Sequence, residues 1–240
     1  MPGVTFRPHE LRRLFYRPSF LGMFSRFQEV INGHVSAGSV LLDAGCGTGR
    51  TLLYRRHLPC VRVLGLDMSP HARDNPNVDS HVRGDLEALP FPNASFDIVL
   101  STHVAEHLAH PETAFGEMAR VLRPGGRLLL LTPNRRHYVP LLARFLPLRL
   151  HVAVNRRRGL DEDEVFPTLY RANTATDLRR LTGGAGLHVE RLEAFETEPE
   201  YLAFHPLAYA AGVLYERLVN RYRVLAPLRV NLLLVARKPA

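Results

Sequence analysis

The chain has 240 residues, 46% apolar content and a formal net charge of +8, values that suit one globular domain and exclude a generally disordered chain. Arginine carries this charge, because Lys238 is the only lysine. The arginines are scattered and no nucleic-acid motif frames them, so a nucleic-acid partner is not favoured. Two cysteines exclude a disulfide framework. Neither a secretory signal nor an apolar run long enough for a spanning helix is recognisable, so we expect a cytoplasmic protein.

Residues 1–35 predict a helical lead-in, and residues 36–134 alternate strand-like with helix-like stretches. The apolar members of the lead-in are Leu14, Phe15, Phe20, Met23, Phe24 and Phe27. Strands are expected in SVLLDAGC (39–46), VRVLGLDMS (61–69), FDIVLSTH (96–103) and RLLLLTPN (127–134). A helix is expected in HPETAFGEMARVL (110–122), ended by the RPGG that follows it. This rhythm predicts a doubly wound α/β fold.

Residues 135–173 interrupt the rhythm with a long, proline-punctuated segment, typical of a substrate-side insertion. Its charged stretch NRRRGLDEDE (155–164) is interpreted as a solvated loop, with a mobile lid as the alternative. Residues 174–240 complete a single domain. They predict a helix in TATDLRRLTGGAG (174–186), with Thr174 or Thr176 as its N-cap, and strands in LHVERLEAFE (187–196) and VNLLLVARKP (230–239). Between those strands, residues 201–225 are apolar and aromatic enough for a helix that packs on something.

The turn after the first predicted strand, DAGCGTGR (43–50), indicates a ligand site. Glycines at 45, 47 and 49 let the backbone approach a ligand, and open α/β sheets bind ligands at the carboxyl ends of their strands. A pyrophosphate facing Asp43 would be repelled by roughly 1 to 4 kcal/mol. The G-x-G-x-x-G order of dinucleotide sites is also absent. A cationic or zwitterionic ligand is therefore favoured over a nicotinamide dinucleotide.

Two further acids follow the next predicted strands. Asp67 ends the second strand, where a carboxylate can accept both hydroxyls of a ribose. A helix N-cap is the alternative role, but Ser69 is better placed to serve as the cap. Asp85 follows a third, short strand and could accept from an adenine amino group, with Leu86 and Met68 on either side of the ring. A plain surface turn is the alternative for Asp85.

Together these stretches resemble the class I S-adenosylmethionine-dependent methyltransferases, especially the group of the ubiquinone and menaquinone biosynthesis methyltransferases (methyltransferase type 11). The resemblance covers residues 40–134, through VLLDAGCGTG, VLGLDMSP and the run from GDLEALPF to LLLLTPN. It implies a seven-stranded Rossmann-like sheet with helices on both faces, whose last strand runs antiparallel. It also implies S-adenosylmethionine as cofactor, bound by Asp43, Ala44, Gly45, Cys46, Gly47, Asp67, Met68, Asp85, Leu86, Ser101 and Thr102.

His103 follows the predicted strand FDIVLSTH and is the candidate catalytic base, because a histidine on that rim could take a proton from the acceptor. Glu106 and His107 are neighbours in sequence and do not share one helical face, so no metal site is expected. In the insertion, His137, Tyr138, Tyr170 and Arg171 are the candidate substrate-lining residues.

The predicted function is methyl transfer, mainly by positioning, to a small-molecule or lipid-like acceptor. A non-enzymatic S-adenosylmethionine-binding regulator is the alternative, and a nicotinamide-dependent oxidoreductase is a weaker one. The basic, aromatic N-terminus and the apolar segment 201–225 raise a further hypothesis of contact with an anionic membrane. Its alternative is that both segments simply cover the sheet.

Overall fold

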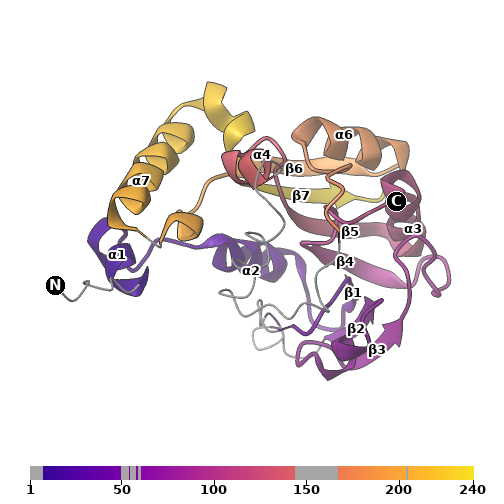
Figure 1. Cartoon of the computed structure of the whole chain (residues 1–240). Coiled ribbons are helices and arrows are strands. Elements are labelled where there is room, and N and C mark those ends of the chain that lie inside the picture. Colours follow the sequence, from indigo (N-terminus) through magenta and orange to yellow (C-terminus); the bar gives the residue numbers. More distant parts are fainter. Residues whose placement is uncertain (1–7, 50–53, 55–57, 59–60, 144–166, 204) are drawn as a thin grey trace.

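The computed structural model describes residues 8–49, 54, 58, 61–143, 167–203 and 205–240. A seven-stranded sheet with the order β3-β2-β1-β4-β5-β7-β6 lies at its centre (Figure 1). Strands β1 to β5 pair in parallel, and β7 runs antiparallel to both β5 and β6. This confirms the expected sheet and its antiparallel last strand. The strands are β1 Val40–Ala44, β2 Arg62–Asp67, β3 Ser80–Arg83, β4 Phe96–Thr102, β5 Leu122–Pro133, β6 His188–Phe195 and β7 Asn231–Arg237.

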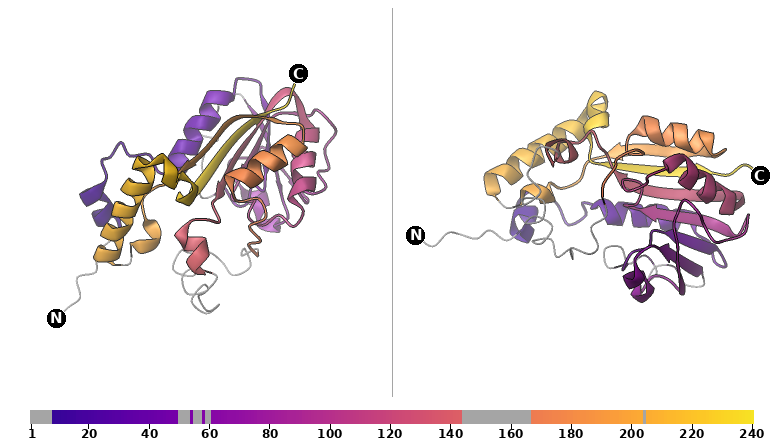
Figure 2. Two further views of the ribbon diagram at one scale, coloured as in Figure 1. Left: turned by 90° about the horizontal axis from the view of Figure 1, so that it is seen from above. Right: turned by 45° about the vertical axis from the view of Figure 1, so that its right-hand side comes forward.

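Both faces of the sheet are covered, because successive residues of its central strands point to opposite sides. In β5, Leu128 and Leu130 belong to one buried cluster, whereas Leu129 and Leu131 belong to the other. Figure 2 shows α2 on one face and α3 with α6 on the other. These covering helices are α2 Met23–His34, α3 Pro111–Val121 and α6 Ala175–Gly184.

The expected helix is confirmed as α3, which ends just before RPGG, but RPGG itself also belongs to a strand. Helix α3 ends at Val121, and residues 123–126 lie inside β5. The β4–β5 register shifts from Phe96↔Leu122 to Ile98↔Arg127, so these four residues form an irregularity in the strand pair. A Cβ on Gly126 would lie only 2.9 Å from the carbonyl oxygen of Asp97. The glycine therefore permits close strand approach instead of capping the helix.

The C-terminal predictions are confirmed in outline. Thr174 is the N-cap of α6, where its hydroxyl accepts a hydrogen bond from the backbone N–H of Asp177. Helix α4 (Tyr138–Ala143) opens the expected insertion. Most of that insertion, including residues 155–164, lies outside the described residues. Three short 3-10 helices complete the described elements: η2 Pro70–Asp74, η4 Glu200–Leu202 and η5 Arg223–Leu228.

Helix α7 (Pro206–Arg221) packs beside α1 (Pro8–Phe15), away from the sheet (Figure 1). Tyr16, Tyr209 and Val213 form a small buried cluster separate from both faces of the sheet. The helix expected in 201–225 is confirmed, but it packs on the N-terminal segment and does not cover the sheet. Among the described residues, no helix combines the length and the apolar character needed to cross a membrane.

Candidate active site

Two carboxylates lie at the carboxyl ends of neighbouring strands β1 and β2. Asp43 is buried, and its Oδ2 accepts a 2.7 Å hydrogen bond from the hydroxyl of Tyr54. Burial raises the pKa of Asp43 to about 6, against the effect of Tyr54, and the nearby charge of Asp67 raises it further. Two acids close together without a bound cation are costly, so this edge of the sheet favours a positively charged group.

The loop between these acids brings its backbone close to other elements. Gly45 has φ +81°, and a Cβ there would overlap the side chain of Val104. Gly47 also has a positive φ of 49°, but a Cβ would meet nothing within 4 Å. With respect to the residues that the structure describes, the backbone at Gly47 therefore borders open space. Asn75 fixes the loop from outside, because its Nδ2 donates to the carbonyls of Cys46 at 2.7 Å and Gly47 at 3.2 Å.

Asp67 holds this loop from the β2 side. Its Oδ2 accepts from the backbone N–H of Gly47 and its Oδ1 from that of Ser69, both at 2.8 Å. Ser69 is the N-cap of η2, as expected, since its hydroxyl accepts from the N–H of His71. Each carboxylate oxygen has two acceptor positions. Asp67 therefore retains acceptor capacity for a ligand hydroxyl.

The remaining predicted cofactor residues differ in exposure. Asp85 is exposed, and its Oδ1 accepts from the N–H of Glu87 at 2.9 Å. Met68 is 53% exposed, whereas Leu86 is only 6% exposed and packs in the core beneath. Met68 thus offers more apolar surface to a ring than Leu86 does. Strand β4 ends with the buried Ser101 and the half-buried Thr102. Ala44, the last residue of β1, is also buried.

His103 follows β4 in a conformation that few side chains adopt, with φ +57°. Its backbone N–H donates to the carbonyl of Leu131 at 2.8 Å, which ties it to the end of β5. Its Nδ1 faces the Oε1 of Glu106 at 3.4 Å, and its Nε2 has no hydrogen-bond partner among the described residues. The ring of Phe24 lies 5.8 Å away. A strained backbone beside a buried ring nitrogen that has no hydrogen-bond partner among the described residues is typical of functional positions.

Glu106 anchors His103 from the core. Its Oε2 accepts from the hydroxyl of Thr132 at 3.1 Å, and Thr132 accepts in turn from the side-chain amide of Asn173 at 2.7 Å. Burial alone raises the pKa of Glu106, but the hydrogen bond and the charge of His103 outweigh it and hold the pKa below its usual value. Glu106 is thus a buried carboxylate that stays charged and orients the imidazole.

The end of the insertion packs against the same segment. The backbone N–H groups of Leu169 and Tyr170 both donate to the carbonyl of Glu106, at 2.7 and 3.0 Å. Arg171 donates to the carbonyl of Ala109 at 2.6 Å. Two predicted substrate residues, Tyr170 and Arg171, therefore lie beside residues 103–109, here called the His103 segment. Burial raises the pKa of Tyr170, with smaller effects of Glu106 and Tyr201, so its phenol stays protonated.

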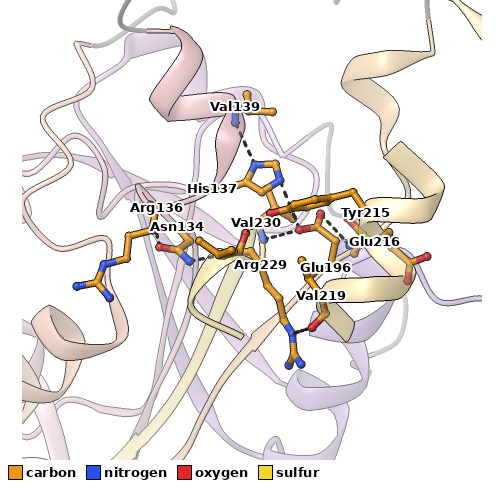
Figure 3. A network of polar contacts seen from close by, with 12 residues as sticks. Asn134, Arg136, His137, Val139, Glu196, Tyr215, Glu216, Val219, Arg229 and Val230 are labelled. Carbon is orange, nitrogen blue, oxygen red and sulfur yellow. Dashed lines mark hydrogen bonds and ion pairs between the residues drawn. The ribbon is translucent and has the colours of Figure 1, made fainter. Parts of the chain in front are cut away.

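His137 lies in a buried polar network that joins the start of α4, the end of β6 and α7 (Figure 3). Its side chain is 2% exposed, and its Nδ1 accepts from the N–H of Val139 at 3.3 Å. Its Nε2 lies 3.4 Å from Oε2 of Glu196. Burial lowers the pKa of His137 to about 4 and raises that of Glu196 to about 8. Near neutral pH the two groups are therefore uncharged and do not form an ion pair.

Tyr138 is brought together with His137, since their ring centroids are 4.0 Å apart. Tyr138 also meets the ring of Tyr215 from α7 edge-on at 5.0 Å. Burial raises the pKa of Tyr138 to about 12. The nearby Tyr201 makes a smaller contribution that raises the pKa of both Tyr138 and Tyr170. Tyr138 and Tyr170 thus both lie within electrostatic reach of Tyr201.

Sequence reasoning missed three residues of this site: Tyr54, Phe24 and Glu106. Glu106 was considered only as a metal ligand beside His107, although the three-residue spacing from His103 was a visible signal. Tyr54 and Phe24 come from segments whose contacts no local pattern reveals. Within the part of the chain that the structure describes, no group of three or more His, Cys, Asp or Glu residues could hold a metal ion.

Comparison with known proteins identifies the central segment. Residues 42–130 match the family described as "Methyltransferase domain". The chain is 44% identical over 99 residues to a malonyl-[acyl-carrier protein] O-methyltransferase of Herminiimonas arsenicoxydans, covering 38% of this chain and 36% of that protein. It is 42% identical over 115 residues to a protein of Mycolicibacterium smegmatis named as an S-adenosylmethionine-dependent methyltransferase, covering 45% and 43%. The chain thus matches less than half the length of these two relatives.

Solved structures share the fold at low identity. The [4+2]-cyclase SpnF aligns over 90% of this chain and 81% of its own, with a TM-score of 0.59 and 21% identity. A geranyl diphosphate methyltransferase, solved in complex with GPP and sinefungin, aligns over 89% and 78% with a TM-score of 0.56 and 18% identity. These likenesses show the Rossmann-like methyltransferase fold. They also show a cyclase on that fold, so the reaction must be argued from the site.

Proposed function

We propose that this chain, whose residues 42–130 match the family described as "Methyltransferase domain", is a class I S-adenosylmethionine-dependent methyltransferase that transfers a methyl group to a small-molecule or lipid-like acceptor. The observation that carries the proposal is the acidic pair Asp43 and Asp67, placed on either side of a loop whose backbone is open at Gly47. A pair of acids at this edge suits the ammonium and sulfonium charges and the ribose hydroxyls of S-adenosylmethionine.

The residues present fit this cofactor in chemistry. Burial raises the pKa of Asp43, and a bound cation would stabilise its charged form. Asp67 keeps acceptor positions for ligand hydroxyls, and Met68 exposes apolar surface on which a ring can pack. When bound, the cofactor supplies an already activated methyl group. The protein therefore needs to hold the acceptor in line with that methyl group and little else.

His103 is the proposed base where the acceptor must lose a proton. Its Nδ1 faces the charged Glu106, so we infer that Nδ1 carries the proton. The buried Nε2, which has no hydrogen-bond partner within the described part of the chain, is left as the acceptor. This is the arrangement in which a carboxylate fixes the tautomer of a catalytic histidine. It favours an acceptor with an ionisable hydroxyl over one that is already a strong nucleophile.

The acceptor side is proposed to involve Tyr170, Arg171 and Tyr138. Tyr170 and Arg171 pack on the His103 segment, and Tyr138 lies beside α7. Phenols that stay protonated can donate a hydrogen bond to the acceptor oxygen. His137, in contrast, is enclosed in its network, and we propose that it acts by positioning Tyr138. Malonyl-[acyl-carrier protein] methyltransferases among the relatives favour an acceptor bearing an acyl chain.

The experiment that tests the proposal is transfer of a radiolabelled methyl group to separated aqueous and lipid fractions of a cell extract. We expect label in one small-molecule or lipid product, recovered and identified by mass spectrometry. Label in macromolecules alone would contradict the proposed acceptor class. Binding of S-adenosylmethionine without transfer to any fraction would favour the non-enzymatic regulator.

A further inference from the structure

We propose that the outer face of α7 docks this protein on an anionic membrane surface. The face consists of residues at the spacing of one helical stripe and the C-cap residue that follows them, here called the α7 stripe: Leu207, Ala211, Leu214, Leu218 and the C-cap Tyr222. Spacings of three and four residues place such side chains on one side of a helix. The docking surface is independent of the proposed function, whereas its use in reaching a lipid-like acceptor rests on that function.

The α7 stripe is exposed although the helix itself is firmly packed. Leu207, Leu214 and Leu218 are 76%, 60% and 44% exposed. The opposite side of α7 is buried through Tyr209 and Val213 in the cluster shared with Tyr16. Exposure of the stripe is therefore a property of one face and not of a frayed helix. Contiguous apolar surface of this kind is typical of interaction sites.

The charges of α7 point to an anionic partner. Its only acid, Glu216, is buried and accepts from the hydroxyl of Tyr16, whereas its two arginines, Arg217 and Arg221, are exposed. On a helical wheel both arginines fall on the same flank of the α7 stripe. Exposed Arg223 follows directly, and η5 adds Val224 at 83% exposure. An apolar face bordered by positive charge suits the acyl and headgroup boundary of an anionic bilayer.

Helix α1 extends the same character. Arg217 donates to the carbonyl of Phe15 at 3.3 Å, so the end of α1 lies at the arginine flank of the stripe. The neighbouring Leu14 is exposed, as are Arg13 and Arg17. A second copy of this chain is a less suitable occupant. Pairing two such faces would bring arginines together with no exposed acid on α7 to meet them.

The stripe is also connected to the acceptor side of the proposed site. Tyr215 of α7 packs edge-on against Tyr138, and its hydroxyl donates to the carbonyl of Leu228. The docking helix thus shares a ring contact with a proposed acceptor residue. Docking through α7 would bring that side of the molecule near the membrane surface.

Vesicle flotation of the full chain tests the proposal, with phosphatidylcholine vesicles compared with mixed phosphatidylcholine and phosphatidylglycerol vesicles. We expect binding to the anionic vesicles only, weakened by added salt. Leu214→Asn/Leu218→Asn should lower the partition coefficient on the order of tenfold or more. Arg221→Gln/Arg223→Gln should lower it by about fivefold per arginine. Control variants are Val189→Asn and Arg73→Gln/Arg179→Gln, which change exposed residues outside α1 and α7.

Three outcomes would overturn the proposal. Protein that stays wholly in the soluble fraction rules it out, as does vesicle binding that the α7 variants leave unchanged. A concentration-dependent dimer that Leu214→Asn/Leu218→Asn abolishes, without vesicle binding, would assign the stripe to a second copy. Calorimetric binding of S-adenosylmethionine is measured on the same variants and should be unchanged. The failure of docking is thereby distinguished from a failure of the proposed function.

Discussion

At the scale of single residues, the chemistry of the site depends on which buried carboxyl groups are charged. Asp43 is a buried acid whose pKa is raised to about 6, while Glu106 is a buried acid whose pKa is lowered. The difference follows from their partners. Asp43 has a neutral phenol and another acid beside it, whereas Glu106 has His103 at 3.4 Å. Asp43 therefore favours a cationic ligand, whereas Glu106 already has a hydrogen-bonding partner in His103.

Glu106 is expected to act through His103. Glu106→Gln should lower kcat while leaving the Kd for S-adenosylmethionine unchanged, and His103→Asn should lower kcat by about 10² to 10⁴-fold, the range of general base catalysis. Steady-state kinetics with the identified acceptor provide the measurement.

His110→Asn is the matched control, since His110 is an exposed histidine in the same segment and should leave both parameters unchanged. Equal kcat in wild type and His103→Asn would remove the base from the account. Unchanged kcat in Glu106→Gln would contradict a role for Glu106 in orienting His103.

At the scale of elements, α4, β6 and α7 are joined through a few buried polar groups. Glu196 at the end of β6 accepts from the N–H groups of Val230 and Thr197, and its Oε2 faces His137. The nearby Glu216 is a second buried acid and raises the pKa of Glu196 further, beyond the larger effect of burial. The contact between these elements is therefore strongest when Glu196 holds a proton.

The contribution of Glu196 to folding stability should consequently fall as pH rises. The folded pKa of Glu196, about 8, lies above the ordinary value of 4.5, so its contribution is fully present below the ordinary value and is lost as pH rises through the folded one. Glu196→Gln removes this dependence. Between pH 5 and pH 8 the free energy of unfolding should shift in favour of the variant by up to about 4 kcal/mol, measured by urea denaturation.

Glu29→Gln, an exposed acid on α2, serves as the control and should follow the wild type at both pH values. Wild type and Glu196→Gln with the same change in unfolding free energy from pH 5 to pH 8 would contradict the assignment of a protonated Glu196.

The sequence predicted those elements whose pattern is local. Short stretches of sequence were enough to predict the buried strands, the Thr174 cap and the acids at the ends of β1 and β2. The end of α3 before RPGG was predicted, but the place of RPGG in β5 was not, because a Pro-Gly-Gly stop and a glycine that permits close strand approach have the same sequence. Only the contact of Gly126 with Asp97 on β4 distinguishes the two roles.

The candidate site was predictable where residues follow strand ends and not where they meet across the chain. His103 and Asp67 were placed from their strands, but the buried relay from Glu106 through Thr132 to Asn173 joins three distant segments. His137 was expected to line a pocket as a polar residue of the insertion. Its burial with Glu196, which comes nearly sixty positions later in the chain, has no local signal.

At the scale of the whole molecule, there are three proposed regions: a cofactor edge, an acceptor side and a docking helix. Asp43 and Asp67 lie at the ends of β1 and β2, His103 follows β4, and Tyr138 links the insertion to α7. Helix α7 lies beyond the sheet beside α1 (Figure 1). All of these roles depend on the acidic edge of the sheet binding S-adenosylmethionine.

Isothermal titration calorimetry of S-adenosylmethionine, S-adenosylhomocysteine and NAD against wild type, Asp67→Ala and Asp74→Ala tests that claim most directly. Asp74 is an exposed acid of the neighbouring η2 and serves as the control. We expect both adenosyl compounds to bind and NAD to produce no heat. Asp67→Ala should lose about 1.5 to 3 kcal/mol of binding free energy, the value of charge-assisted hydrogen bonds, while Asp74→Ala binds like the wild type. Binding of NAD alone, or unchanged affinity in Asp67→Ala, would contradict the account.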